Sequence, residues 1–244
     1  MLENHFHDHG DHTGGDCGCS GACDCDQIGP IEADTTGGAT GVATPLEAAA
    51  PINTNLVNQL DSGRTWITST GQVADTITYG APTTSGFASP LGEAAGWSAL
   101  NAQQQATMRD AIGLWDDLIA TDFVEADGNS ADIKFSNTTT NVGYAHAYSP
   151  GIAGDEGGTY GPIFGSVWLN SNYNSGTNDL VTPESGDWGF MTYVHEIGHA
   201  LGLDHAGNYN GGSPSYGDTS TGWIYAEDSI QYTVMSYFGA SNTG

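Results

Sequence analysis

The segment HEIGHALGLDH, residues 195–205, decides how the second half of this chain folds. It holds three of the chain's eight histidines. Apolar residues precede and enter it at the spacing of one helix face: Phe190, Val194, Ile197 and Leu201. This stripe predicts a helix whose apolar side faces a core. His195 and His199, four residues apart, then project from the same side and can share one cation.

Gly202 offers a route for a third imidazole. Glycine tolerates a positive φ, so the helix can end there and the chain can turn back, bringing His205 to the same ion. Three neutral imidazoles bind Zn²⁺ and leave one coordination position open for water, which distinguishes a catalytic zinc site from a closed structural one. Glu196, directly after the first histidine, is placed to act as a general base toward that water. A chance arrangement of core or surface histidines is the alternative, and the number of matched positions argues against it.

The rest of the chain contains the parts of an α+β fold. Asn101 is placed to cap a helix predicted for residues 101–119, with Gln104 three residues on, and one apolar stripe runs along it. A shorter helix is predicted around residues 52–60, ending before Gly63. Four segments have the apolar and β-branched pattern of strands: DTITYGAP (75–82), ADIKFS (131–136), VGYAHAYSP (142–150) and GSVWLN (165–170). The 36 glycines predict long irregular connections between these elements.

The chain is strongly acidic, with 29 Asp and Glu residues against three Lys and Arg and a formal net charge of −26. Such a surface repels the phosphates of nucleic acids and of anionic lipids, so we expect neither as a partner. No apolar run approaches the roughly 18 residues of a membrane-spanning helix. The first ten residues also lack the basic and apolar parts of a signal peptide. The acidity fits either adaptation to a salty or calcium-rich medium or simply a soluble surface.

Residues 1–50 are predicted to form a flexible tail or pro-segment ahead of a folded domain at 51–244. Histidines alternate with acidic residues at the start of this tail, and all four cysteines of the chain follow: Cys17, Cys19, Cys23 and Cys25. Such a tract could bind metal ions or block an active site, and an unstructured leader is the alternative. The cysteine spacing matches no usual zinc-finger pattern. Because no cysteine lies beyond position 25, disulfides do not hold the folded domain.

The segment 195–205 matches the metzincin motif H-E-x-x-H-x-x-G-x-x-H, which is followed in that family by a methionine turn beneath the metal. Met235, in YTVMSYF, is placed to be that methionine. Among metzincins the chain resembles the serralysins, and the resemblance extends over residues 51–244. It is carried by HAGNYNGGSPSYGD and YAEDSIQYTVMSYF after the zinc motif, and by LNAQQQATMRDAIGLWDDL in the first long helix.

The resemblance implies a twisted five-stranded mixed sheet with two long helices and an irregular C-terminal subdomain, with a zinc cleft between the two parts. His195, His199 and His205 would hold one catalytic Zn²⁺. Glu196 would be the catalytic base. Tyr237, two residues after the turn methionine, would bind the resting metal and then move to stabilise the reaction intermediate.

The implied activity is that of a secreted, monomeric zinc endopeptidase acting on proteins and peptides, with Ca²⁺ as a possible second cofactor. The extracellular location rests on the resemblance alone. Extended substrate would pair with an edge strand above the zinc, and GSVWLN (165–170) is predicted to be that strand. His146 is predicted to be a strand surface residue without a role in the site.

Two features depart from the serralysins. The calcium-binding nonapeptide repeats of that family do not occur up to Gly244, which fits a catalytic fragment or a short variant. The tail also does not look like the usual short propeptide. Two alternatives stay open: a catalytically silent protein that binds or sequesters metal, and a latent protease in which a tail cysteine or aspartate occupies the open zinc position.

Overall fold

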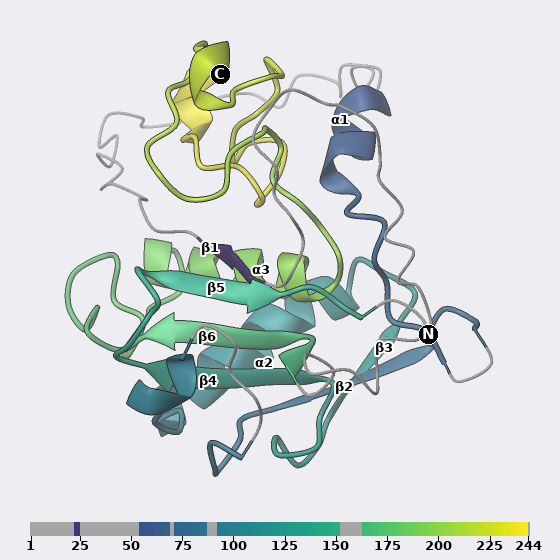
Figure 1. Ribbon diagram of the computed structural model, residues 1–244, viewed down its shortest axis with the longest axis vertical. Coiled ribbons are helices and arrows are strands. Elements are labelled where there is room, and N and C mark those ends of the chain that lie inside the picture. The colour runs from purple at the N-terminus through teal and green to yellow at the C-terminus, as the bar shows by residue number, and fades with distance from the viewer. Residues whose placement is uncertain (1–21, 25–53, 69–70, 87–91, 152–162, 244) are drawn as a thin grey trace, which may run out of the picture.

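The computed structural model describes residues 22–24, 54–68, 71–86, 92–151 and 163–243. Within them a mixed sheet carries two long helices on one face, and the C-terminal part of the chain forms a separate region beyond the sheet (Figure 1). In this described part of the chain, no helix combines the length and the apolar character needed to cross a bilayer.

Six strands form the sheet in the order β1-β5-β6-β4-β2-β3. Their bounds are β1 Ala22–Asp24, β2 Thr76–Gly80, β3 Asp122–Glu125, β4 Ile133–Thr138, β5 Ala145–Tyr148 and β6 Ser166–Asn170. Strands β3, β2, β4 and β6 run parallel to one another, whereas β5 is antiparallel to β6. The five strands β2 to β6 confirm the predicted mixed sheet and the α+β class. Strand β1 adds a sixth, antiparallel to β5.

Strand β6 lies inside the sheet, between β5 and β4. The prediction that GSVWLN is an edge strand is therefore wrong. Val167 and Leu169 belong to the main core, while Trp168 lies in a second apolar cluster on the opposite face. A strand with both faces covered is typical of the interior of a sheet. On the side of β6 away from β4, the next strand is β5. Strand β1 pairs with the outer side of β5.

The two long helices are α2, Ala102–Asp116, and α3, Trp188–Ala200. Asn101 and Gln104 form the predicted capping box, in which each side chain accepts from the other residue's backbone N–H at 2.9 Å. Both helices pack on the same face of the sheet and share its core, which includes Met108 and Ile112 from α2 and Tyr193 and Ile197 from α3. The predicted short helix is α1, Thr54–Leu60, and it buries only Leu56.

Beyond α3 the chain has little regular structure, as the glycine content predicts: the described C-terminal residues contain only short 3₁₀ turns at Thr219–Thr221 and Ala240–Asn242. Gly202 has φ 103°, so the chain turns directly after α3, as predicted. The turn is held from the N-terminal side, because the Ser62 N–H donates to the Gly202 carbonyl at 3.1 Å and the Asp204 N–H donates to the Leu60 carbonyl at 2.8 Å. These bonds aim the following residues back toward α3.

Candidate metal centre

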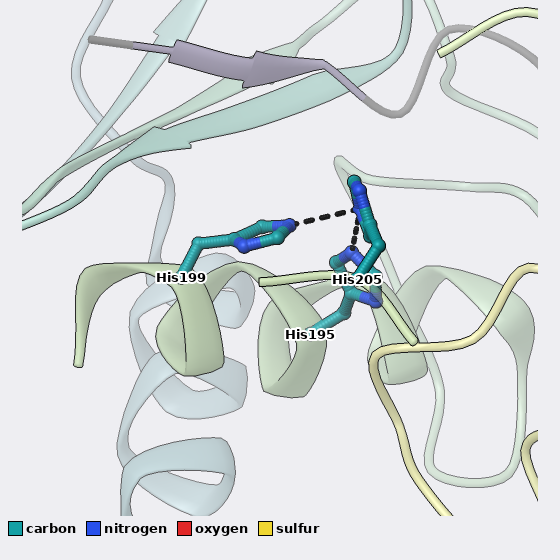
Figure 2. Close-up of side chains that lie close together, drawn as sticks. All are labelled: His195, His199 and His205. Carbon is teal, nitrogen blue, oxygen red and sulfur yellow. Dashed lines mark hydrogen bonds between the residues drawn. The ribbon is translucent and has the colours of Figure 1, made fainter. Parts of the chain in front are cut away.

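Three imidazoles converge where α3 passes into the C-terminal region (Figure 2). His195 and His199 project from one side of α3, and His205 reaches them from the loop after Gly202. The Nε2 atom of His205 lies 3.3 Å from that of His195 and 3.1 Å from that of His199. All three side chains are buried. In the described segments this is the one group of three or more His, Cys, Asp or Glu side chains spaced to share a metal ion.

Each of these rings has its other nitrogen held by a backbone carbonyl. The Nδ1 atoms of His195, His199 and His205 lie 2.7, 2.7 and 2.8 Å from the carbonyl oxygens of Val234, Leu203 and Tyr209. A carbonyl can only accept, so each neutral ring carries its proton on Nδ1 and has a lone pair on Nε2. Three lone pairs that face one another repel unless a cation lies between them. The donor set thus fits a metal ion, and this second layer of carbonyls is typical of metal-bound histidine.

The spacing of the nitrogens also fits zinc. Zinc–nitrogen bonds of about 2.0–2.1 Å in a tetrahedron place neighbouring ligand nitrogens about 3.3 Å apart. The separations of the His205 nitrogen from the other two, 3.3 and 3.1 Å, agree with this geometry, and all three ligand atoms lie within 4.8 Å of one another. Three protein ligands leave a tetrahedral ion one further position, as in catalytic rather than structural zinc sites.

Burial keeps these histidines neutral. It lowers the pKa of His195 to about 4, against the opposing effect of the hydrogen bond to Val234. Burial, followed by the proximity of the other site histidines, lowers the pKa of His199 and of His205 well below the ordinary value. Imidazoles must be neutral to ligate a metal, so the fold holds the site in its binding form.

Glu196 follows His195 on α3 and is fully buried. Met235 is also fully buried and lies directly against the helix, since a Cβ atom on Gly198 would be 2.4 Å from its Sδ atom. The helix therefore needs glycine at position 198 to pack on the methionine. Met235 thus packs against α3 from the C-terminal region. A methionine turn is predicted in this part of the chain.

Tyr237, the other residue predicted for the site, lies beside the three histidines. Its ring centroid is 4.7 Å from that of His205 and 6.0 Å from that of His195. Its hydroxyl oxygen accepts a hydrogen bond from the backbone N–H of Gly211 at 3.2 Å. The structure thus brings all five predicted site residues into one region.

His146 does not belong to this site, but the prediction that it is a surface residue is wrong. It is fully buried, and its Nε2 atom lies 3.0 Å from Oε1 of Glu93, which also accepts from the Tyr148 hydroxyl at 2.6 Å. The reason is the alternation along β5: Ala145 and Ala147 face the main core, and His146 and Tyr148 face the other side of the sheet, where the segment containing Glu93 covers them.

Sequence reasoning missed two residues next to the site. Tyr209 supplies the carbonyl that holds His205, and Asp228 binds the Tyr209 hydroxyl at 2.8 Å. No spacing rule connects positions 205, 209 and 228, so only the folded chain reveals their contact. The His/Cys-rich tract was the other predicted metal-binding feature, and apart from residues 22–24 it lies outside the described residues.

Known proteins are similar to this chain over much of its length, including the histidine site. Residues 95–211 match the matrixin family. The chain is 35% identical over 184 residues to serralysin of Proteus mirabilis, covering 71% of this chain and 36% of that protein. It is 40% identical over 159 residues to serralysin C of Dickeya chrysanthemi (61% and 30%) and 38% identical over 154 residues to metalloprotease AprA of Pseudomonas entomophila (61% and 29%). The chain thus spans about a third of the length of these curated relatives.

The matrixin match includes the helices α2 and α3, the strands β3 to β6 and the whole segment 195–205. The sequence resemblance is therefore confirmed by the family match, by the serralysin relatives and by the histidine geometry together. The chain contains a metzincin catalytic domain of the serralysin type.

Proposed function

We propose that this protein is a zinc-dependent endopeptidase. His195, His199 and His205 hold the ion, Glu196 acts as general base, and Tyr237 supports the transition state. The convergence of three Nε2 lone pairs, each fixed by a backbone carbonyl, carries the proposal. A serralysin-type site with these residues in place has the parts that hydrolysis of an amide requires.

Zn²⁺ in such a site supplies Lewis-acid activation of both a water molecule and the substrate carbonyl. The Glu196 carboxylate then accepts a proton from the attacking water and passes it to the leaving amine. The Tyr237 hydroxyl donates a hydrogen bond to the developing negative charge on the carbonyl oxygen. The buried surroundings of the histidines strengthen these interactions, because a low dielectric screens charges less than water does.

Strand β5 is the element that would position substrate. It is antiparallel to β6, packs against α3 and has its outer side directed away from the rest of the domain sheet. An extended peptide pairing with this side would be held through its main chain and thus with little regard to sequence. We therefore propose proteins and peptides as substrates and, from the serralysin resemblance, an extracellular location. Calcium binding stays a prediction.

Peptide cleavage should depend wholly on the metal. We expect the zinc-loaded protein to release peptides from a mixed proteome, and a zinc chelator to abolish their release. Mass spectrometry of the products, with and without the chelator, measures activity, metal dependence and cleavage preference in one assay. Zinc stoichiometry well above one together with no cleavage would instead support the alternative of a metal-sequestering protein.

A second proposal is that the N-terminal tail keeps the protease latent. The supporting observation is strand β1, which pairs with β5 antiparallel in the register Ala22 to Tyr148, Cys23 to Ala147 and Asp24 to His146. Figure 2 shows β1, in purple, and β5, in teal, on the side of α3 that carries the three imidazoles. The tail thus uses the main-chain groups that an extended substrate would need.

Deletion of residues 1–45 is expected to raise kcat/KM for a peptide substrate by about tenfold or more, because a competing intramolecular strand reduces the fraction of protein able to bind. Deletion of residues 1–21 is the matched control, since it shortens the tail but keeps β1. It should leave kcat/KM close to that of the full chain. Equal activity of all three proteins, with unchanged absorption spectra after Co²⁺ substitution, would contradict latency.

A further inference from the structure

We propose that Tyr209 and Asp228 position Tyr237 for the reaction. This inference rests on the proposed peptidase function and adds two residues to it. Both residues lie outside the zinc motif, and the spacing of the motif does not predict that either of them lies near the metal ligands. Their placement follows from contacts within the C-terminal region.

Tyr209 contacts both a metal ligand and the proposed catalytic tyrosine. Its ring stacks on that of His205, with centroids 5.3 Å apart and an interplanar angle of 27°. It also packs against the ring of Tyr237, with centroids 4.8 Å apart. Phe238 closes the arrangement by meeting Tyr209 edge-on at 5.7 Å. Tyr209 is 7% and Tyr237 9% exposed, so neither ring can move without disturbing the other.

Asp228 fixes the direction of the Tyr209 hydroxyl. A phenol has one proton, and Tyr209 donates it to Oδ1 of the fully buried Asp228 at 2.8 Å. The lone pairs of the hydroxyl oxygen are then left to accept. The backbone N–H of Tyr237 donates to that oxygen in a long hydrogen bond of 3.4 Å. Asp228 thus acts through Tyr209 on the backbone that carries the catalytic side chain.

The two functions of Tyr209 use different atoms. Its backbone carbonyl holds Nδ1 of His205, and its side-chain hydroxyl holds the amide of Tyr237. The substitution Tyr209→Phe keeps the carbonyl and the ring but removes the hydroxyl. It therefore separates an effect on Tyr237 from an effect on the metal ligand.

A double-mutant cycle tests the inference on the full chain. Tyr237→Phe is expected to lower kcat by about 10²-fold, the usual effect of removing one donor to the transition state. Tyr209→Phe is expected to lower kcat by about tenfold with KM unchanged, because misplacement by a fraction of an ångström weakens catalysis. In the double variant the second change should lower kcat by less than about a further twofold.

Asp228→Asn, which keeps an oxygen acceptor, should retain more activity than Asp228→Ala. Multiplicative losses in the double variant, or a normal kcat for Tyr209→Phe, would overturn the inference.

Readouts independent of turnover complete the test. Zinc affinity, measured by competition with a chelator, should be the same in Tyr209→Phe as in the parent protein, and a tenfold or larger loss would show that the hydroxyl acts through His205 instead. The absorption spectrum of the Co²⁺-substituted protein should change in the same direction in Tyr209→Phe and Tyr237→Phe. A spectral change in Tyr237→Phe alone would overturn the inference, and this result does not depend on peptide cleavage. Absence of cleavage by the parent protein would refute the peptidase function instead.

A matched control is Tyr193→Phe. Tyr193 is fully buried and donates its hydroxyl proton to the Leu180 carbonyl at 2.9 Å, within the core under the sheet. The variant loses a buried hydroxyl just as Tyr209→Phe does, but it should keep kcat, the Co²⁺ spectrum and zinc affinity. A similar fall in kcat in both variants would mean that Tyr209 acts only through general stability.

Discussion

Replacing Glu196 with Gln is expected to leave zinc binding intact and to lower kcat/KM for peptide cleavage by about 10²- to 10⁴-fold, the range that a positioned general base contributes. The amide has nearly the shape of the carboxylate but cannot accept the proton of the attacking water. The metal ligands are untouched, so the metal content should not change. Steady-state cleavage of a fluorogenic peptide and metal analysis of the purified variant measure both parts of this prediction.

Glu93→Gln provides the matched control for this substitution. Glu93 is also fully buried, but it binds His146 and Tyr148 on the face of the sheet opposite the helices. We expect this variant to lose some stability and to keep kcat within about threefold of the parent, since general base catalysis does not involve this face. Near-normal turnover in Glu196→Gln would refute the assignment of the base, whatever the control shows.

Replacing Gly202 with Ala is expected to lower the free energy of unfolding by more than about 3 kcal/mol and to weaken zinc binding strongly. Alanine at φ 103° is strained, and its Cβ atom would lie 2.0 Å from the carbonyl oxygen of Arg64. Relief of this clash must move the turn that delivers His205, because the segment at Arg64 is held against α3 by the Trp66 indole, which donates to the Ala200 carbonyl at 2.9 Å. Denaturant unfolding and chelator competition measure the two effects.

Gly212→Ala is the control that separates the effect of a positive φ from the effect of a steric clash of the added Cβ atom. Gly212 also has a positive φ, 76°, but an added Cβ atom would meet nothing within 4 Å. Its substitution should cost only about 1–2 kcal/mol, the penalty of a left-handed conformation for an L-residue, and zinc affinity should be retained. If both variants lost the same stability and both bound zinc normally, the turn at Gly202 would not be what places His205.

Local sequence signals were enough to predict the parts of the site that lie on one element. The stripe of Val194 and Ile197 predicts α3, and the i, i+4 spacing places His195 and His199 on one side of it, because helix geometry acts over only a few residues. Gly202 could be identified as the turn for the same reason, since a positive φ is a property of a single residue. The capping box at Asn101 is equally local.

The tertiary structure alone decided which strand lies at the edge of the sheet, that His146 is buried with Glu93, and that Tyr209 contacts both Asp228 and Tyr237. Strand order depends on how all segments bury their apolar faces at once, and the sequence of GSVWLN shows only that it is apolar, not which neighbours it takes. Likewise, residues 209, 228 and 237 meet through loops whose paths no periodicity describes. The helices, caps and turns of this chain thus follow from residues that are close in sequence. The strand order and the contacts between distant segments depend on the packing of the whole core.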